Sequence, residues 1–340
     1  MISPWLVLFP LAAVAGAYLV TGRVLGYATH RLVDVPNDRS SHAVPTPRGG
    51  GVSIVVITLV AIVALTAIGV LPWTVSLGMF GAGLIVAGIG FADDHRHVHP
   101  GLRLLAHFVA AAWLVGWIGP VVSLPIAGRV VDLSFAAYPL AILYVVWVLN
   151  LSNFMDGIDG IAAIEALTVT VSSAIVYALS ARVGADMLVP LTVAGAVLGF
   201  LIWNWPPARI FMGDVGSGFL GVMMAGLSLE AAQLSPRLFW AWLILLGVFI
   251  VDATVTLVRR TVRGDRFYEA HRTHAYQHAA VRFGSHRRVT IATGLITLIW
   301  LLPIAIVVGN GTVDGALGLL AAYIPLIALV LWLKAGQAMG

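Results

Sequence analysis

Apolar residues recur along this chain in stretches long enough to cross a lipid bilayer. A transmembrane helix needs about 20 apolar residues, with roughly 17 to 25 tolerated. The chain is 60% hydrophobic and only 10% charged, whereas a soluble domain carries about 25% charged residues. The sequence therefore predicts an all-α, polytopic membrane protein, folded as one helical bundle over residues 1–340. We count about eleven spans, near 3–22, 51–71, 77–92, 103–119, 136–151, 160–180, 187–203, 215–233, 238–258, 289–308 and 314–333.

Lysine and arginine are distributed unevenly between the loops that these spans separate. If alternate loops lie on opposite sides, 16 of the 19 cationic residues share one side, and the exceptions are Arg129, Arg182 and Arg237. Cytoplasmic loops carry the excess of Lys and Arg, so we expect the N-terminus outside and the C-terminus inside. The ten histidines fall on or just within the same side. We therefore expect the chemistry in cytoplasmic loops near 23–50, 93–102, 152–159, 204–214 and 259–288.

The chain contains no cysteine, which excludes disulfides and thiolate metal sites. The apolar stretch near Met1 lacks a basic leader and an evident small-residue cleavage site. We expect it to be a retained first span rather than a signal peptide.

The loop near 204–214 holds an acid, an arginine and several glycines between two apolar spans. Pro206 and Pro207 cannot continue a helix, so the preceding span is expected to end just before them. The glycines from Gly213 onward let backbone approach a ligand closely. Asp214, at the mouth of the next helix, suits a hard cation such as Mg²⁺ held together with phosphate oxygens. The alternative is a connecting loop whose acid only faces water.

The first cytoplasmic loop combines basic residues with proline and glycine. Pro45 and Pro47 stiffen the backbone, and the glycines at 49–51 free it beside Arg48. Arginine and backbone N–H groups can together hold phosphate. The alternative is a basic loop that sets the topology and meets anionic lipid.

The second loop opens with two adjacent acids, Asp93 and Asp94. Paired carboxylates repel, which raises one pKa unless a cation lies between them. A metal or a proton-transfer role would explain the pair. Arg103 begins the next helix on the same side and suits a lipid phosphate. Between Asp94 and Arg103, the alternating histidines His95, His97 and His99 are interpreted as part of a solvated basic loop rather than as a metal site.

The third loop places two more acids beside amides. Asp156 and Asp159 are three residues apart, so they share a face if the segment is helical. Asn150 and Asn153 add amide donors and acceptors, and Glu165 lies in the following span. Glu165 is either functional or paired within the bundle.

The ninth span and the loop after it contain the remaining candidates. Asp252 lies inside an apolar stretch, where an acid is costly and functional by default; the alternative is an ion pair with Arg259 or Arg260. The loop then carries His271 and His274 without a His-Glu-x-x-His zinc signature. Its cations suit an anionic, sugar-bearing ligand, and the alternative is again a basic cytoplasmic loop.

Taken together and in order, these motifs resemble one family, the polyprenyl-phosphate N-acetylhexosamine-1-phosphate transferases of glycosyltransferase family 4. The matching segments are 45–50, 91–94, 150–160, 208–217, Asp252 with Arg260, and 271–274. The resemblance implies transfer of an N-acetylhexosamine 1-phosphate from a UDP-sugar to undecaprenyl phosphate, with release of UMP and with Mg²⁺, or alternatively Mn²⁺, as cofactor. It implies a multi-pass protein of the bacterial inner membrane whose catalytic cleft faces the cytoplasm. Its partners would be the two substrates and the lipid bilayer but no nucleic acid, and a homo-oligomer is left open.

The same resemblance assigns roles to residues of this chain. Asp214 and Asp94 would hold the metal, and Asp93 would be a base or a covalent nucleophile. Asp156 and Asp159 match a motif that lies around the nucleotide. These five acids are the expected catalytic set. The expected substrate-binding residues are His42, Arg48, Arg103, Asn150, Asn153, Arg209, His271, Arg272 and His274.

The sugar and the pathway are less constrained than the reaction. The segment 271–277 looks like the subgroup that starts O-antigen on a 6-deoxy N-acetylhexosamine or N-acetylglucosamine, whereas several family members carry a denser His-x-His-His motif. Lipid I synthesis on a muramoyl-pentapeptide is the alternative within the family. An ion-coupled transporter is the alternative of another class, although the acids cluster at one membrane face and no repeat is visible. A non-catalytic scaffold would need no clustered carboxylates.

Overall fold

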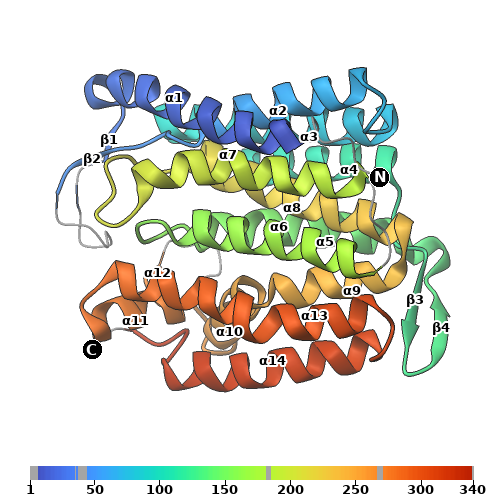
Figure 1. Ribbon diagram of the computed structural model, residues 1–340. Coiled ribbons are helices and arrows are strands. Elements are labelled where there is room, and N and C mark those ends of the chain that lie inside the picture. Colours follow the sequence, from blue (N-terminus) through green and yellow to red (C-terminus); the bar gives the residue numbers. More distant parts are fainter. Residues whose placement is uncertain (1–6, 35, 37–43, 181–184, 266–270, 339–340) are drawn as a thin grey trace.

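The computed structural model describes residues 7–34, 36, 44–180, 185–265 and 271–338, and its helices run side by side in one bundle (Figure 1). The α-helices are α1 (Leu8–Arg31), α2 (Val52–Ala67), α3 (Trp73–His95), α4 (Pro100–Ile118), α5 (Ala137–Phe154), α6 (Ile161–Leu179), α7 (Leu188–Asn204), α8 (Asp214–Leu234), α9 (Pro236–Leu245), α10 (Gly247–Val262), α11 (Ala275–Phe283), α12 (His286–Leu295), α13 (Leu302–Gly309) and α14 (Gly315–Trp332). A π-helical segment, Ile296–Leu301, joins α12 to α13.

The helices confirm the predicted all-α membrane class. Within the described residues, eight helices are long and apolar enough to cross a bilayer, and the number is nine if α9 and α10, which meet at a bend of 68°, count as one span. The helices α2 and α7 are also apolar but only 16 and 17 residues long. Every predicted stretch overlaps described helical residues: the ninth lies on the bent pair, the tenth on α12, the π-helical segment and α13, and each of the others on one helix. The count of eleven spans stays a prediction, because α2 and α7 are at or below the usual length.

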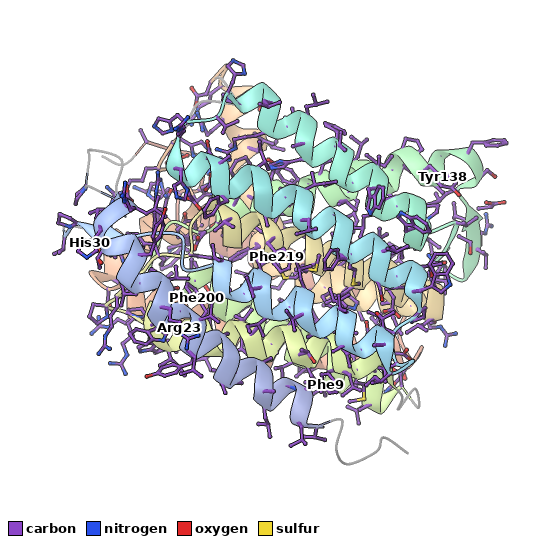
Figure 2. The ribbon with its side chains drawn as sticks, turned by 90° about the horizontal axis from the view of Figure 1, so that it is seen from above. Phe9, Arg23, His30, Tyr138, Phe200 and Phe219 are labelled. Carbon is purple, nitrogen blue, oxygen red and sulfur yellow. The ribbon has the colours of Figure 1, made fainter. Side chains whose placement is uncertain are left out.

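Two short antiparallel strand pairs mark opposite ends of the bundle (Figure 1). At one end β1 (Val33–Asp34) pairs with β2 (Thr46–Pro47), and at the other β3 (Ser123–Ile126) forms a hairpin with β4 (Arg129–Asp132). In Figure 2 the side-chain nitrogen atoms gather at the end that holds His30, away from Tyr138. We call this end, where α3, α5 and α7 finish and α4, α6 and α8 begin, the site end.

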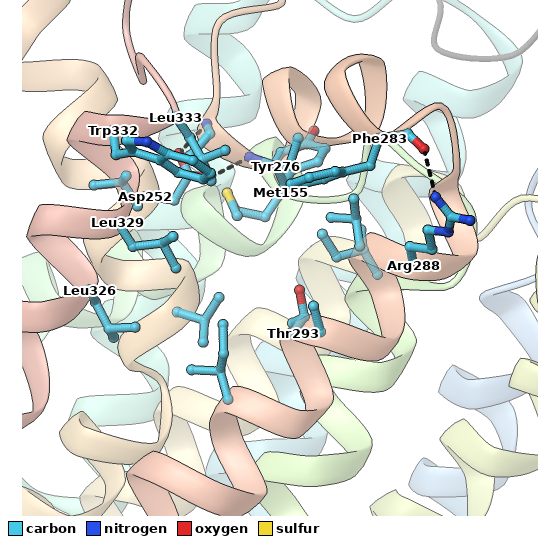
Figure 3. A pocket seen from close by; sticks show the side chains of 18 residues that line it. Met155, Asp252, Tyr276, Phe283, Arg288, Thr293, Leu326, Leu329, Trp332 and Leu333 are labelled. Carbon is cyan, nitrogen blue, oxygen red and sulfur yellow. Dashed lines mark hydrogen bonds between the residues drawn. The ribbon is translucent and has the colours of Figure 1, made fainter.

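An apolar cavity of about 370 Å³ lies between α10, α11, α12 and α14 (Figure 3). Its walls include Val248 of α10, Ala279 of α11, Val289 of α12 and Leu326 of α14. Large apolar side chains on the outer helices, such as those of α1 and α14, are exposed. An apolar exterior is what contact with lipid requires.

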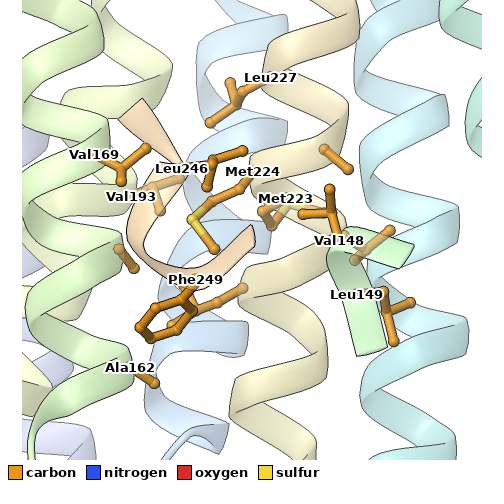
Figure 4. Packing of buried hydrophobic residues seen from close by; sticks show 14 of the residues in the cluster. Val148, Leu149, Ala162, Val169, Val193, Met223, Met224, Leu227, Leu246 and Phe249 are labelled. Carbon is orange, nitrogen blue, oxygen red and sulfur yellow. The ribbon is translucent and has the colours of Figure 1, made fainter. Parts of the chain in front are cut away.

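The helix α8 occupies the centre of the bundle, and the whole of its most apolar 18-residue window is buried. Met223 and Leu227 of α8 belong to one buried apolar cluster with Leu149 of α5 and Phe249 of α10 (Figure 4). Small residues let helices approach closely inside a membrane. At Gly221, for example, a Cβ atom would lie 2.6 Å from the Leu149 Cα atom. This packing fixes the N-terminus of α8 relative to α3 and α5.

Candidate active site

An arginine at the site end joins acids from two helices. Nη1 of Arg103 lies 2.5 Å from Oδ2 of Asp93 and 3.2 Å from Oδ2 of Asp214. Nη2 of the same guanidinium group lies 3.4 Å from Oδ1 of Asn153. The structure therefore brings together four residues that the sequence analysis assigned to the site, from α3, α4, α5 and α8. A planar guanidinium group suits this arrangement because its N–H donors point in several fixed directions.

The Asp214 carboxylate is held from a second side as well. Nδ2 of Asn153 donates to Oδ1 of Asp214 at 2.9 Å and lies 3.1 Å from Oγ of Ser217. About a third of the Asp214 side chain stays accessible, at 33%. The carboxylate is thus fixed in direction and still open to a ligand. As the sequence predicts, α7 ends at Asn204 before the prolines, and Asp214 is the first residue of α8.

Asp94 caps the N-terminus of α8, a role that the sequence analysis did not predict. Its Oδ1 atom accepts the backbone N–H of Asp214 at 3.1 Å, and its Oδ2 atom accepts that of Val215 at 3.2 Å. The first amides of a helix lack partners within the helix, so an acid supplied by another helix stabilises them. Gly213 has a φ of 77°, and a Cβ atom there would lie 2.6 Å from Oδ2 of Asp94. Only glycine fits between the cap and the helix.

The glycine-rich loop before α2 lies against the loop before α8. The backbone N–H of Gly51 donates to the carbonyl of Met212 at 2.9 Å, and a Cβ atom on Gly51 would lie 2.3 Å from the Cα atom of Gly216. Arg48, in the same loop, donates from Nη2 to the backbone carbonyl of Asp94 at 2.7 Å. Two loops that are more than 150 residues apart in the sequence therefore form one unit.

Asp156 lies in a turn, because α5 ends at Phe154 and α6 begins at Ile161. The condition for a shared helical face with Asp159 is therefore not met. Loss of solvation, together with the neighbouring carboxylates of Asp214, Asp94 and Asp159, holds the pKa of Asp156 well above its usual range. These effects all act in one direction, which indicates a site where a cation would relieve repulsion between carboxylates.

Asp159 joins three segments of the chain. Its Oδ2 atom accepts the backbone N–H of Ala208 at 3.2 Å, and its Oδ1 atom lies 3.4 Å from Nδ1 of His286. Its backbone carbonyl accepts the Thr290 hydroxyl at 2.7 Å. The Asp159 carboxylate thus connects the start of α6 to the loop before α8 and to α12.

The carboxylate of Asp252 caps α11. It accepts the backbone N–H groups of Ala275 at 2.9 Å and Tyr276 at 3.0 Å, and Nδ1 of His274 lies 3.3 Å from its Oδ1 atom. The acid inside the ninth predicted span therefore positions the segment that carries the predicted sugar-binding residues.

Residues 271–274, which we call the histidine segment, lie beside the turn that contains Asp156. The Tyr276 hydroxyl donates to the carbonyl of Phe154 at 3.1 Å. Burial and the carboxylates of Asp252 and Asp156 hold the pKa of Tyr276 well above its usual range, so the phenol keeps its proton. The rings of His271 and His274 lie 4.9 Å apart. Nε of Arg272 is buried and has no hydrogen-bond partner within the described part of the chain.

Three predicted residues lie away from this network or outside the described residues. Nδ2 of Asn150 donates to the Val146 carbonyl of its own helix at 2.7 Å. The Arg209 guanidinium group lies over the Trp203 ring, 5.7 Å from its centroid. His42 lies outside the described residues.

Sequence reasoning missed Ser217, His286 and Asn204. Asn204 accepts the backbone N–H of Gly160 at 3.0 Å and donates to the Ile210 carbonyl at 2.9 Å. The available signal was an amide at the last position of an apolar span, two residues before the first of two prolines. No comparable signal singled out His286 among ten histidines.

The donor set at this end consists of hard oxygen ligands. Among the described residues, no three side chains of His, Asp or Glu are arranged to hold a metal ion by themselves. Mg²⁺ does not require such a cage, since it is commonly bound through one or two carboxylates plus substrate phosphates. Two carboxylates fit that pattern: that of Asp214, which is partly accessible, and that of Asp156, whose pKa is raised by neighbouring carboxylates. The oxygens of Asp94 already cap α8, so only their remaining lone pairs are left to an ion.

Comparisons with known proteins identify the family of the chain. Residues 76–232, which include Asp93, Arg103, Asn153 and Asp214, match the model of the family described as glycosyl transferase family 4.

The chain is 32% identical over 286 residues to a probable undecaprenyl-phosphate N-acetylglucosaminyl 1-phosphate transferase of Bacillus subtilis, covering 83% of this chain and 78% of the relative. It is 31% identical over 329 residues to the decaprenyl-phosphate N-acetylglucosaminephosphotransferase of Mycobacterium tuberculosis, covering 87% and 80%. A phospho-N-acetylmuramoyl-pentapeptide-transferase of Streptococcus suis is 28% identical over 288 residues, covering 78% and 77%. The chain therefore belongs to glycosyl transferase family 4, among the polyprenyl-phosphate N-acetylhexosamine-1-phosphate transferases, and is a phosphoglycosyltransferase.

Proposed function

We propose that the protein transfers an N-acetylhexosamine 1-phosphate from a UDP-sugar to undecaprenyl phosphate and releases UMP, which starts O-antigen or a related cell-envelope polysaccharide. The observation that carries this proposal is the Arg103 guanidinium group between Asp93 and Asp214, beside the Asp156 turn and the histidine segment. The names of the relatives favour N-acetylglucosamine as the sugar. Family membership leaves no support for the transporter and scaffold alternatives.

In this reaction an oxygen of the lipid phosphate attacks the phosphorus that carries the sugar, and the bond from that phosphorus to UMP breaks. Phosphoryl transfer depends mainly on positioning and on neutralising charge. Asp214 and Asp156 would hold Mg²⁺ or Mn²⁺ with the diphosphate of the UDP-sugar. When bound, such an ion neutralises the charge that develops on the phosphate oxygens.

Asp93 positions the lipid phosphate through Arg103 in this proposal. Its Oδ1 atom accepts the backbone N–H of Val98 at 2.8 Å, and its Oδ2 atom accepts from Arg103. A carboxylate with both oxygens engaged is a poor nucleophile, which favours direct transfer over a covalent intermediate. A phosphate has a second pKa of about 6, so the acceptor needs little help from a base at neutral pH.

The two substrates would approach the site from different surroundings. The histidine segment, with the unpartnered Nε of Arg272, supplies cationic and hydrogen-bonding groups for the diphosphate and the N-acetyl sugar. The phosphate of the lipid would instead meet Arg103 at the start of α4, in the orientation that Asp93 of α3 gives it. The excess of Arg on this side favours a cytoplasmic orientation in a bacterial inner membrane.

The test is a turnover assay of the purified protein with undecaprenyl phosphate, Mg²⁺ and one UDP-sugar at a time. The panel contains UDP-N-acetylglucosamine, other UDP-N-acetylhexosamines and UDP-N-acetylmuramoyl-pentapeptide. We expect UMP release with a simple N-acetylhexosamine donor, none without the lipid, and release that is slower by about a hundredfold or more with the Asp214→Asn control. UMP release only with the pentapeptide donor would instead show that the protein carries out lipid I synthesis.

A further inference from the structure

The C-terminal residues 335–337, which we call the C-terminal strap, are tied to the region around the histidine segment. The backbone N–H of Gly336 donates to the Thr273 carbonyl at 2.7 Å, directly inside that segment. Arg259 of α10 donates to the Ala335 carbonyl at 2.7 Å, and Arg263 donates to the Gly336 carbonyl. The strap follows α14, which packs against α10.

Gly336 makes this contact possible. Its φ is 76°, a conformation that other residues adopt only with strain. A Cβ atom there would lie 3.0 Å from Cβ of Arg259 and 3.2 Å from the Thr256 carbonyl oxygen. On the other side of the strap, Nε2 of His278 lies 3.0 Å from the Gln337 carbonyl oxygen. The strap therefore contacts α10, α11 and the histidine segment through its own backbone N–H and carbonyl groups.

The strap fixes a part of the histidine segment that the Asp252 cap does not reach. The cap begins at His274 and continues into α11. Thr273 lies one residue earlier, and its hydroxyl lies 3.0 Å from Nδ1 of His271. The orientation of the His271 ring and of the neighbouring Arg272 thus depends on where the strap places the Thr273 carbonyl.

We propose that the C-terminal strap is a positioning element for the donor substrate, which sets the affinity for the UDP-sugar by holding the histidine segment in its binding conformation. This inference rests on the proposed function, in which that segment contacts the diphosphate and the sugar. The strap touches no reacting atom, so its effect is on binding of one substrate. Losing it should leave the affinity for the lipid phosphate unchanged, since Asp93 and Arg103 are held by other helices.

Gly336→Ala tests the proposal, and Gly128→Ala is its matched control. Both glycines have a φ of 76°, but no atom lies within 4 Å of a Cβ built on Gly128, which is in the β3–β4 turn at the far end of the bundle. The two variants therefore carry the same backbone strain, and only Gly336→Ala disturbs the strap. A second variant, Arg259→Gln, removes the bond to the Ala335 carbonyl without adding an atom to the turn.

We expect Gly336→Ala and Arg259→Gln to raise the KM for the UDP-sugar about fivefold or more, the scale of one lost hydrogen bond. The KM for undecaprenyl phosphate should stay at the Gly128→Ala value. Equal changes in both KM values, or no change relative to Gly128→Ala, would overturn the inference.

Hydrogen exchange separates this inference from the proposed function. In the intact protein, Gly336→Ala should speed amide exchange at 271–274 relative to both the wild type and Gly128→Ala, whatever donor the enzyme uses. Unchanged exchange at 271–274 would refute the positioning role of the strap even if UMP release is normal. Faster exchange in a protein that releases no UMP would instead refute the proposed reaction and leave the strap in place.

Discussion

Asp94 holds Asp214 by its backbone: Oδ1 of Asp94 accepts the Asp214 N–H at 3.1 Å, across 120 residues of sequence. The residue proposed to bind the metal is therefore placed by a neighbouring acid that lies one position after Asp93 in α3. The two adjacent acids of this motif therefore have different roles. Asp93 orients the arginine, and Asp94 fixes the helix on which Asp214 begins.

Replacing Asp94 should separate these roles. Asp94→Ala leaves two helix amides without an acceptor, and the loss of a helix cap costs about 0.5–2 kcal/mol. Asp94→Asn keeps one acceptor oxygen and should lose less. We expect a lower unfolding temperature for both variants, in the order Ala below Asn, and reduced UMP release in the same order. Thermal unfolding in detergent checks the order, and equal stability of Asp94→Ala and wild type would contradict the cap.

Asp214→Asn should nearly abolish turnover while the protein stays folded. The amide oxygen can still accept from Asn153, but the variant lacks the charge that a metal requires. Because a metal ion supplies several kcal/mol at a phosphoryl-transfer centre, kcat should fall about a hundredfold or more. Initial rates across a Mg²⁺ titration measure this. Wild-type rates with an unchanged Mg²⁺ dependence would show that Asp214 is not the ligand.

Asp156 should make stability depend on pH in the absence of Mg²⁺. Its raised pKa means that the folded protein binds this proton more tightly than the unfolded chain. Stability is therefore lost as the pH rises from the ordinary value of 3.8 through the raised one. Asp156→Asn removes the repelling charge and should unfold a few degrees higher than wild type at pH 8, about the effect of 1 kcal/mol.

The same variant should show no such gain near pH 4 or in saturating Mg²⁺, where wild-type Asp156 is protonated or neutralised. Thermal unfolding at the two pH values, with and without Mg²⁺, gives the four required numbers. A gain that is independent of both pH and Mg²⁺ would point to packing rather than charge.

The histidine segment should select among donor sugars. Changing Arg272 and Thr273 together to histidine removes a bidentate donor and the hydroxyl beside Nδ1 of His271. We expect kcat/KM to change by different factors for different UDP-N-acetylhexosamines, because a site built from specific hydrogen bonds discriminates strongly. A common factor for all donors would assign the segment to general phosphate binding. A change in lipid dependence alone would show that it lies elsewhere.

The membrane orientation can be checked with reporter fusions. Fusions after Arg129, in β4, and after Arg237, in α9, should report the periplasm, since the rest of the arginines lie mostly at the opposite end. A fusion after Arg263 should report the cytoplasm. Activity of a periplasmic reporter at Arg263 would reverse the assignment of the site end.

Local sequence signals predicted much of this site because the relevant forces act within a few residues. The prolines at 206 and 207 end α7, and the glycines around Asp214 permit its close contacts, so the start of α8 could be foreseen. The capping roles of Asp94 and Asp252 could not, because each acid serves a helix far along the chain. The pairing of Asp159 with His286 spans 127 residues in the same way.

The ninth span shows a different limit of sequence reasoning. Residues 238–258 form one apolar stretch, yet the structure breaks it between α9 and α10 with a 68° bend. Hydropathy measures the affinity of a stretch for lipid and carries no information about its direction. The backbone break at Leu246 and Gly247 follows from packing against other helices, where Tyr323 and Leu326 of α14 lie close to Gly247.

The burial of the apolar part of α8 determines which substitutions that helix can accept. A helix that is surrounded by protein does not have to be apolar throughout, and α8 accordingly buries the side chains of Ser217 and Ser228. Its limit is bulk: a single added methyl at Gly221 would meet the Leu149 backbone. The opposite holds for α14, where only 28% of the most apolar window is buried and lipid tolerates any apolar shape. In a mutational scan of this protein, the loss of stability should therefore follow side-chain volume for substitutions in α8 and side-chain polarity for substitutions in α14.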